Sequence, residues 1–128
     1  MLEKSEAFSG FAVRDRDAAK DFYGGTLGLS VRVLDEENGL MQLELAGGRN
    51  VLVYRKDDHA PATYTILNFP VDDVEGTVAA LRDRGVEFER YEGTDVEADE
   101  DGVFRGPGPL IAWFTDPSGN ILSVVEAG

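Results

Sequence analysis

The chain has 128 residues, 42% of them hydrophobic and 29% charged, which is ordinary for a globular protein of one-domain size. It contains no cysteine, which excludes disulfides, thiolate catalysis and cysteine-based zinc sites. Twelve basic against 25 acidic residues give a net charge of −13, which argues against binding to nucleic acid or to anionic membranes. The sequence shows no apolar run long enough to span a bilayer and no apolar signal segment, so we expect a cytoplasmic protein.

The first half of the chain reads as a strand, a short helix and three further strands. The predicted ranges are 8–14 for the first strand, 15–24 for the helix, and 29–35, 40–46 and 50–55 for the remaining strands. Gly24, Gly25 and Gly28 are expected to end the helix. The dipeptide Asn38-Gly39 predicts a two-residue hairpin turn between the second and third strands.

The second half repeats this order after a polar linker at 56–62. The predicted ranges are a strand at 64–71, a helix at 73–84, and strands at 86–92, 109–115 and 120–126. Asp72 and Glu75 have the spacing of a helix capping box, with aspartate as the cap. Gly85 is a typical residue to end the helix.

The two halves match at a constant offset of 58 residues. The matching residues are Phe11, Val13 and Asp15 in the first half and Phe69, Val71 and Asp73 in the second. We therefore predict a single domain over 1–128 made of two βαβββ units, 8–56 and 64–126. Neither unit can bury an apolar face alone, so the expected fold is α+β: a curved mixed sheet with helices on its convex side and a groove on its concave side.

Three stretches carry a resemblance to a known family: VRDRDAAKDFYGGTLGL, FPVDDVEGTVAALRDRGV and FTDPSGNILSVVE. In their order and spacing they resemble the vicinal oxygen chelate superfamily. That superfamily includes glyoxalase I, bleomycin resistance proteins, fosfomycin-modifying enzymes and extradiol dioxygenases. The resemblance covers roughly residues 8–126 and implies the fold described above.

The resemblance also implies where a metal would bind. Enzymes of this family usually hold a divalent ion with His, Glu or Gln side chains from the first and last strands of each unit, and the ion grips adjacent oxygens of the substrate. The four corresponding positions here are Phe8, Ile66, Ser123 and an apolar residue within 51–53. Three of these side chains cannot donate a lone pair and serine is a poor substitute, so we expect no metal and no cofactor.

Other candidate ligands and bases are few. His59 is the only histidine and follows the acidic pair 57–58, so it is either a ligand or general base at the groove edge or an exposed linker residue. The acidic run 99–101 could bind calcium weakly, but its spacing matches no EF-hand loop. Glu126 could act as a general base or could simply be exposed. No nucleophile constellation or phosphate-binding glycine loop is present.

Period-2 alternation along the strands predicts which side chains face the groove. The ligand-binding candidates are Asn68, Ser123, Tyr54, Trp113, Phe104 and Arg105. Asn68 would either orient a ligand or be satisfied by the backbone. Tyr54 and Trp113 would wall the groove or be core aromatics. Phe104 and Arg105 lie in a loop that could close over a ligand.

The segment 92–101 holds six acids in ten residues. Such a block is typical of a solvated, mobile loop. It could instead be an acidic lip that attracts a cationic ligand, or reflect a host with an acidic proteome. The sequence leaves these three interpretations open.

The leading functional hypothesis is a metal-independent small-molecule binding protein, with the sequestering of a drug as one such role. The alternatives are a glyoxalase-like lyase or isomerase, or a dioxygenase-related enzyme with a non-standard site, and a regulatory or partner-binding module. The charge of −13 favours a neutral or cationic aromatic ligand. Because the edges of open sheets need cover, we also expect a homodimer.

Overall fold

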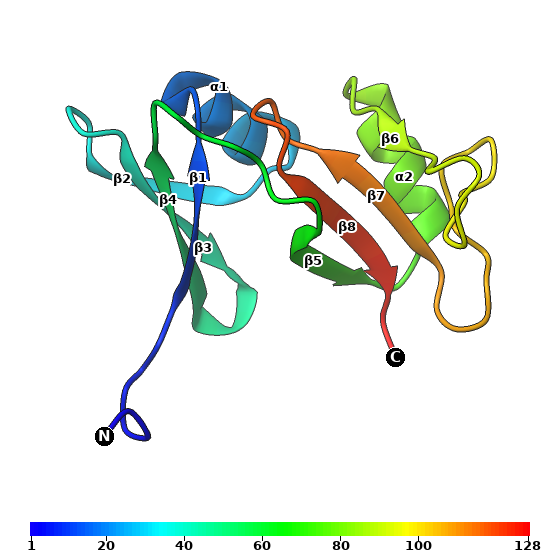
Figure 1. Ribbon diagram of the computed structural model, residues 1–128, viewed down its shortest axis with the longest axis horizontal. Helices are drawn as coiled ribbons and strands as arrows, with labels where there is room; N and C mark the ends of the chain where they lie inside the picture. The colour runs from blue at the N-terminus through cyan, green and yellow to red at the C-terminus, as the bar shows by residue number, and fades with distance from the viewer. The chain divides into compact units, whose positions relative to one another are not determined.

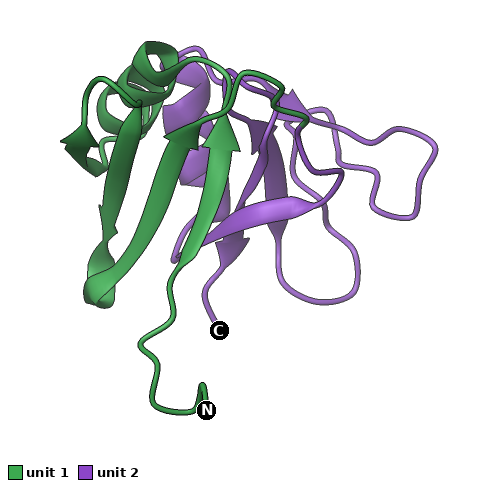
Figure 2. Ribbon diagram, turned by 60° about the vertical axis from the view of Figure 1, so that its left-hand side comes forward, with its two compact units in different colours: residues 1–60 green, residues 61–128 purple.

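The computed structural model describes all of residues 1–128, and the chain divides into two compact units (Figure 1). Unit 1 is Met1–Ala60 and unit 2 is Pro61–Gly128 (Figure 2). Each unit contains one four-stranded mixed sheet and one main helical segment. This confirms the α+β class and the two βαβββ units predicted from the internal repeat.

Unit 1 is built from five main elements and a short 3₁₀ turn. They are β1 (Ser9–Val13), α1 (Arg16–Lys20) continuing into a π-helix (Asp21–Thr26), β2 (Ser30–Asp35), β3 (Leu40–Leu45), the 3₁₀ turn (Ala46–Gly48) and β4 (Arg49–Arg55). The sheet order is β1-β4-β3-β2, and only the β1–β4 pair is parallel. Phe11 packs on Tyr23 with 5.6 Å between ring centroids, which places the core of unit 1 between its sheet and its helix.

The helix of unit 1 is longer than predicted. Gly24 and Gly25 were expected to end it, but they lie inside the π-helix and the helical path runs on to Thr26. The Leu27 N–H bonds to the Phe22 carbonyl five residues earlier, as a π-turn requires. Only Gly28, with φ +74°, adopts the left-handed conformation that ends the segment.

The turn between β2 and β3 is also longer than predicted. Asp35 pairs directly with Leu40, so four residues, 36–39, form the loop instead of two. The Asp35 carboxylate accepts hydrogen bonds from the Asn38 side chain at 2.8 Å and from its backbone N–H at 3.1 Å. The side-chain bond first, and then the backbone bond, hold the pKa of Asp35 below its ordinary value. An aspartate thus organises a wider turn than the Asn-Gly dipeptide suggested.

Unit 2 repeats the arrangement. Its elements are β5 (Thr65–Val71), α2 (Val74–Asp83), β6 (Phe88–Glu89), β7 (Ile111–Thr115) and β8 (Ile121–Glu126). The sheet order is β5-β8-β7-β6, with β5 and β8 parallel. The strand predicted at 86–92 is reduced to two residues, because the Val86 N–H bonds back to the Leu81 carbonyl at the end of α2 and Tyr91 turns the chain with φ +49°.

Helix α2 begins one residue later than the capping-box spacing implied. Asp73, not Asp72, is the N-cap, and its carboxylate accepts a hydrogen bond from the Gly76 N–H at 2.9 Å. A Cβ on Gly76 would lie 2.4 Å from Asp73 Oδ2, so glycine leaves room for this cap. Glu75 instead bonds to Arg105. The predicted end is confirmed: Gly85 has φ +89° and its N–H bonds to the Arg82 carbonyl.

Substituting the cap provides a direct test of this boundary. We expect Asp73→Ala to lower the free energy of unfolding by about 1 kcal/mol, because a helix N–H loses its acceptor. The matched variant Asp72→Ala should stay within about 0.5 kcal/mol of the wild type. Urea unfolding followed by circular dichroism measures both. A larger loss in the Asp72 variant would restore the capping-box assignment.

No helix of the protein is both long and apolar enough to cross a membrane.

Candidate functional site

The sheet of unit 2 has one face covered by α2 and one face without a helix. Phe114 and Leu122 are fully buried, and α2 packs on the strands that carry them. Alternation then places Trp113 and Ser123, which pair across β7 and β8, on the helix-free face. Asn68 pairs with Ser123 from the other side, and the Ser123 hydroxyl donates a hydrogen bond to Asn68 Oδ1 at 2.5 Å. Three of the predicted groove residues therefore lie side by side in unit 2.

An aromatic hollow of about 330 Å³ opens in unit 2 at one end of this face. We call it the aromatic hollow; its walls include Tyr64, Tyr91, Thr94, Val96, Trp113 and Ile121. Tyr91 meets Trp113 edge to face, with 5.4 Å between ring centroids. The threonines at 63, 65 and 94 add hydroxyl groups to the lining. The volume and the mixture of rings with a few polar groups suit a small organic ligand.

The electrostatics of the aromatic hollow are acidic. Residues 61–128 contain 14 acidic and four basic side chains, so unit 2 carries −10 of the total charge of −13. Glu89 pairs with Trp113 in the sheet, which places the two side chains on the same face. Partial burial first, and then the charge of Glu89, raise the pKa of the Tyr91 hydroxyl.

Phe104 and Arg105 are adjacent in sequence, but their side chains lie on different faces of unit 2. Phe104 packs on Trp113, with 5.9 Å between ring centroids. A Cβ on Gly106 would lie 2.2 Å from Phe104 Cζ, so glycine is what allows the Phe104 ring to take this place. Arg105 points to the opposite side of unit 2 and pairs with Glu75 of α2. Tyr54 belongs to β4 of unit 1, where it is partly exposed.

The acidic segment 92–101 is mostly exposed to solvent, as the solvated-loop interpretation expects, but hydrogen bonds at its Ala98 and Asp99 fix it to the rest of unit 2. Ala98 within it is buried, and its N–H bonds to the Arg90 carbonyl at 2.7 Å. Asp99 accepts hydrogen bonds from Arg105 and from the backbone N–H groups of Asp101 and Val103. Burial alone would raise the pKa of Asp99, but these bonds outweigh it and lower the pKa below its ordinary value.

The positions that would hold a metal in enzymes of the family do not fit one here. Phe8 is 71% exposed just before β1, and Ile66 lies at a bulge in β5. The strand pairing also fixes the fourth position within 51–53. Gly10 matches Asn68 at the offset of 58, and Gly10 pairs with Leu52 as Asn68 pairs with Ser123, so Leu52 is the counterpart of Ser123. Phe8, Ile66 and Leu52 offer only hydrocarbon, and Ser123 is already bonded to Asn68. Nowhere do three or more His, Cys, Asp or Glu side chains gather as a metal would require. That this protein works without metal stays a prediction.

His59 is buried, so its interpretation as an exposed linker residue is wrong, while its role as a ligand or general base stays a prediction. Its side chain is only 7% exposed and Nε2 lacks a hydrogen-bond partner. Its backbone carbonyl accepts a hydrogen bond from Arg14 at 2.9 Å, which draws the linker onto unit 1. Glu126 is exposed, and it accepts a hydrogen bond from the Leu110 N–H.

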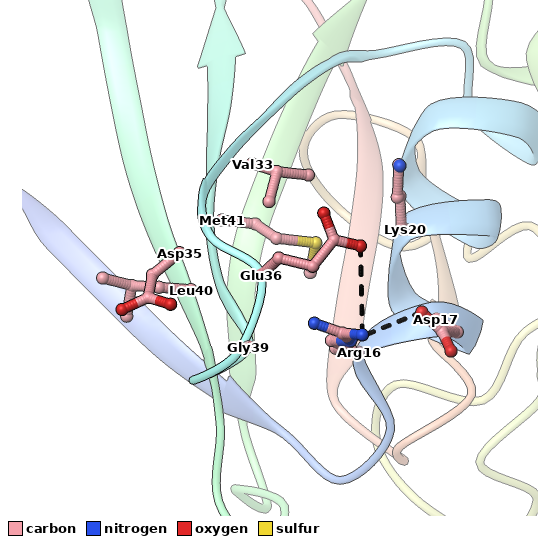
Figure 3. Close-up of a pocket in the computed structure, with 9 residues that line it drawn as sticks. All are labelled: Arg16, Asp17, Lys20, Val33, Asp35, Glu36, Gly39, Leu40 and Met41. Carbon is pink, nitrogen blue, oxygen red and sulfur yellow. Dashed lines mark ion pairs between the residues drawn. The ribbon is translucent and has the colours of Figure 1, made fainter.

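Two hollows of unit 1 are weaker candidates for a ligand site. Figure 3 shows the first, between α1 and the β2–β3 turn, where Arg16 lies 3.5 Å from Asp17 and 3.9 Å from Glu36. Its volume of about 10 Å³ has room for no more than a water molecule. The second is a wide depression of about 560 Å³ beside the π-helix, with no aromatic side chain and with Gly24 and Gly25 in its wall.

The sequence missed two of the three rings of the aromatic hollow, Tyr64 and Tyr91. Tyr64 lies just before β5 and is 70% exposed, and Tyr91 follows the short strand β6. Alternation from Glu89 would place Tyr91 on the face of Trp113, but only once the β6–β7 register is known. No local signal marks Tyr64, because an exposed aromatic residue before a strand is common in any sequence.

The fold and these residues place the chain in a family. The model of the Glyoxalase/Bleomycin resistance protein/Dioxygenase superfamily matches residues 8–124, so the chain belongs to this superfamily, as the resemblance of its motifs predicted. No curated protein sequence matches the chain significantly.

Solved structures share the fold along nearly the whole chain. TnmS3, an antibiotic binding protein from Streptomyces sp. CB03234, is 24% identical with a TM-score of 0.71, and 98% of each chain is covered. A superfamily member from Sphaerobacter thermophilus is 24% identical with a TM-score of 0.68, covering 94% of this chain and 96% of its own. A glyoxalase family protein from Enterococcus faecalis is 23% identical with a TM-score of 0.66, and the match covers 98% of this chain and 100% of that protein's chain.

Proposed function

We propose that this protein binds a small aromatic molecule non-covalently in the aromatic hollow of unit 2, and that it prefers neutral or cationic ligands over anionic ones. The observation that carries the proposal is the grouping of Tyr64, Tyr91 and Trp113 around one opening of about 330 Å³. Rings in this arrangement offer stacking surfaces and negatively polarised faces. TnmS3 is an antibiotic binding protein, which supports small-molecule binding as a use of this fold.

The charge of unit 2 supports the preference for cations. A net charge of −10 enriches cations near the aromatic hollow and repels anions. A cation over an aromatic face gains about 0.5–2 kcal/mol, which is roughly a twofold to thirtyfold increase in affinity. The steering part of this preference should weaken with salt, because the Debye length falls from about 10 Å at 0.1 M to about 3 Å at 1 M.

A matched panel tests the proposal. Benzyltrimethylammonium, benzyl alcohol and benzylsulfonate share one ring and differ in charge. Trp113 is the only tryptophan and lines the aromatic hollow, so its emission reports binding directly. We expect the ammonium compound to bind most tightly and the sulfonate least, with the difference shrinking between 0.1 and 1 M salt.

The outcomes separate the alternatives. Tighter binding of the sulfonate would overturn the electrostatic preference. No response from any compound, extended to larger drug-like aromatics, would favour a partner-binding module. Turnover of a bound compound would favour an enzyme with a non-standard site.

A further inference from the structure

Arg90 and Arg105 lie within the segment 90–105 and bond to other residues of it, and Arg82 bonds to it from α2. The four basic residues of unit 2 are all arginines. Arg90 Nε donates to the Asp99 carbonyl at 3.0 Å, and its Nη1 lies 3.0 Å from Glu92 Oε1. Arg82 of α2 donates to the Glu100 carbonyl at 3.4 Å and lies 3.7 Å from Asp101. Unit 2 has a net charge of −10, and most of its few positive charges bond to this one segment, which suggests that they hold the segment in place.

Arg105 makes the closest of these contacts and joins two elements. Its Nε lies 2.7 Å from Asp99 Oδ2, and its Nη2 lies 3.0 Å from Glu75 Oε2 on the first turn of α2. The other oxygen of Asp99 accepts the N–H groups of Asp101 and Val103, both at 2.9 Å. Through Asp99, therefore, one guanidinium ties the whole turn 99–103 to the helix.

The same segment forms a wall of the aromatic hollow. Tyr91, Thr94 and Val96 line the hollow, and the Thr94 hydroxyl donates to the Tyr91 carbonyl at 2.7 Å. The wall is joined to the arginine contacts by Arg90, whose carbonyl accepts the Ala98 N–H and whose side chain holds the Asp99 carbonyl. Hydrogen bonds and ion pairs thus connect Glu75 to Asp99 and Asp99 to Arg90, and the backbone then leads directly from Arg90 to Tyr91 beside Trp113.

We propose that Arg105 is a positioning residue: by holding Asp99 against Glu75, it keeps the wall formed by Tyr91, Thr94 and Val96 in place beside Trp113. It would set the ligand affinity of the aromatic hollow without touching the ligand. The effect on affinity rests on the proposed function, whereas the effect on the wall does not. Exposed ion pairs add little to global stability, so the consequence of losing this one is local opening of the segment.

Variants separate the contact from its charge. Arg105→Gln removes both ion pairs, and Glu75→Gln weakens the tie to α2 by removing its charge while leaving the Arg105–Asp99 pair. Arg105→Lys keeps the charge but lacks the planar fork that spans two carboxylates. The control is Arg32→Gln, an exposed arginine of unit 1 whose loss changes the net charge by the same amount.

The first readout needs no ligand. We expect the Trp113 emission of Arg105→Gln to shift to longer wavelength, and its quenching by acrylamide to rise about twofold, because the Tyr91 wall moves off the indole. Glu75→Gln and Arg105→Lys should lie between this variant and the wild type, and Arg32→Gln should match the wild type. Thermal unfolding is expected to change little in any of them. Emission and quenching unchanged in Arg105→Gln, or changed equally in Arg32→Gln, would overturn the proposal.

The second readout is the affinity for benzyltrimethylammonium. Arg105→Gln should weaken it about threefold to tenfold, with Arg105→Lys partly restoring it and Arg32→Gln leaving it at the wild-type value. If the wild type binds but Arg105→Gln binds equally well, the positioning role is wrong. If the emission of Arg105→Gln shifts as expected while the wild type binds no member of the panel, the positioning role stands and the proposed function fails.

Discussion

Replacing Phe114 with alanine is expected to lower the free energy of unfolding by about 3–5 kcal/mol, the largest effect of any single change proposed for this protein. Phe114 is 1% exposed, lies on the face of β7 that α2 covers, and packs on Phe88 with 5.5 Å between ring centroids. Alanine would leave a cavity that the surrounding strands can only partly close. Guanidinium unfolding followed by circular dichroism measures the loss.

Phe8→Ala is the matched control for this substitution. The Phe8 side chain is 71% exposed, so the same chemical change should cost no more than about 0.5 kcal/mol. Equal losses in the two variants would mean that the core of unit 2 does not lie between α2 and its sheet.

The largest expected effect on binding comes from Trp113→Ala. Trp113 contacts both Tyr91 and Phe104 and lines the aromatic hollow, so its removal takes away the central ring of the site. We expect the affinity for benzyltrimethylammonium to fall by about 2 kcal/mol, or roughly thirtyfold, measured by calorimetry since the fluorescent reporter is gone. Trp113→Phe, which keeps a smaller ring, should lose less.

Tyr54→Ala provides the comparison that locates the site. Tyr54 is a candidate from the sequence, but it lies in β4 of unit 1 and does not line the aromatic hollow. Its loss should leave the affinity unchanged. A loss of affinity in Tyr54→Ala as large as in Trp113→Ala would place the ligand elsewhere.

Much of the fold could be predicted because local sequence patterns determine it. The repeat of Phe11, Val13 and Asp15 in the second half marks both units, and Gly85 marks the end of α2. Alternation also places Asn68, Ser123 and Trp113 on one face, because side chains alternate between the two faces in every β-strand. The pairing of Asn68 with Ser123 then follows from the parallel register of β5 and β8.

The features that the sequence did not indicate depend on contacts between residues far apart in the chain. Arg105 was predicted as a ligand-binding candidate, and the structure pairs it with Glu75, 30 residues away, which the sequence pattern assigns to a helix cap. The same arginine bonds to Asp99, six residues before it, which a count of acidic residues in the segment does not indicate. His59 was expected to be an exposed linker residue or a groove-edge base, and no local pattern indicates that its side chain is buried. Charge counts on the sequence describe how much charge is present, but not which pairs neutralise it.

The position of β8 has a consequence for the order in which the protein folds during synthesis. β8 is the last strand of unit 2 along the chain, yet it lies between β5 and β7 and pairs with both. β4 has the same place in unit 1, between β1 and β3. Neither sheet can close until its last strand has left the ribosome, and β5 must wait longest with an unpaired edge. We therefore expect the nascent chain to be most prone to aggregation just before β8 emerges, when β5 and β7 are both present without the strand that pairs with them.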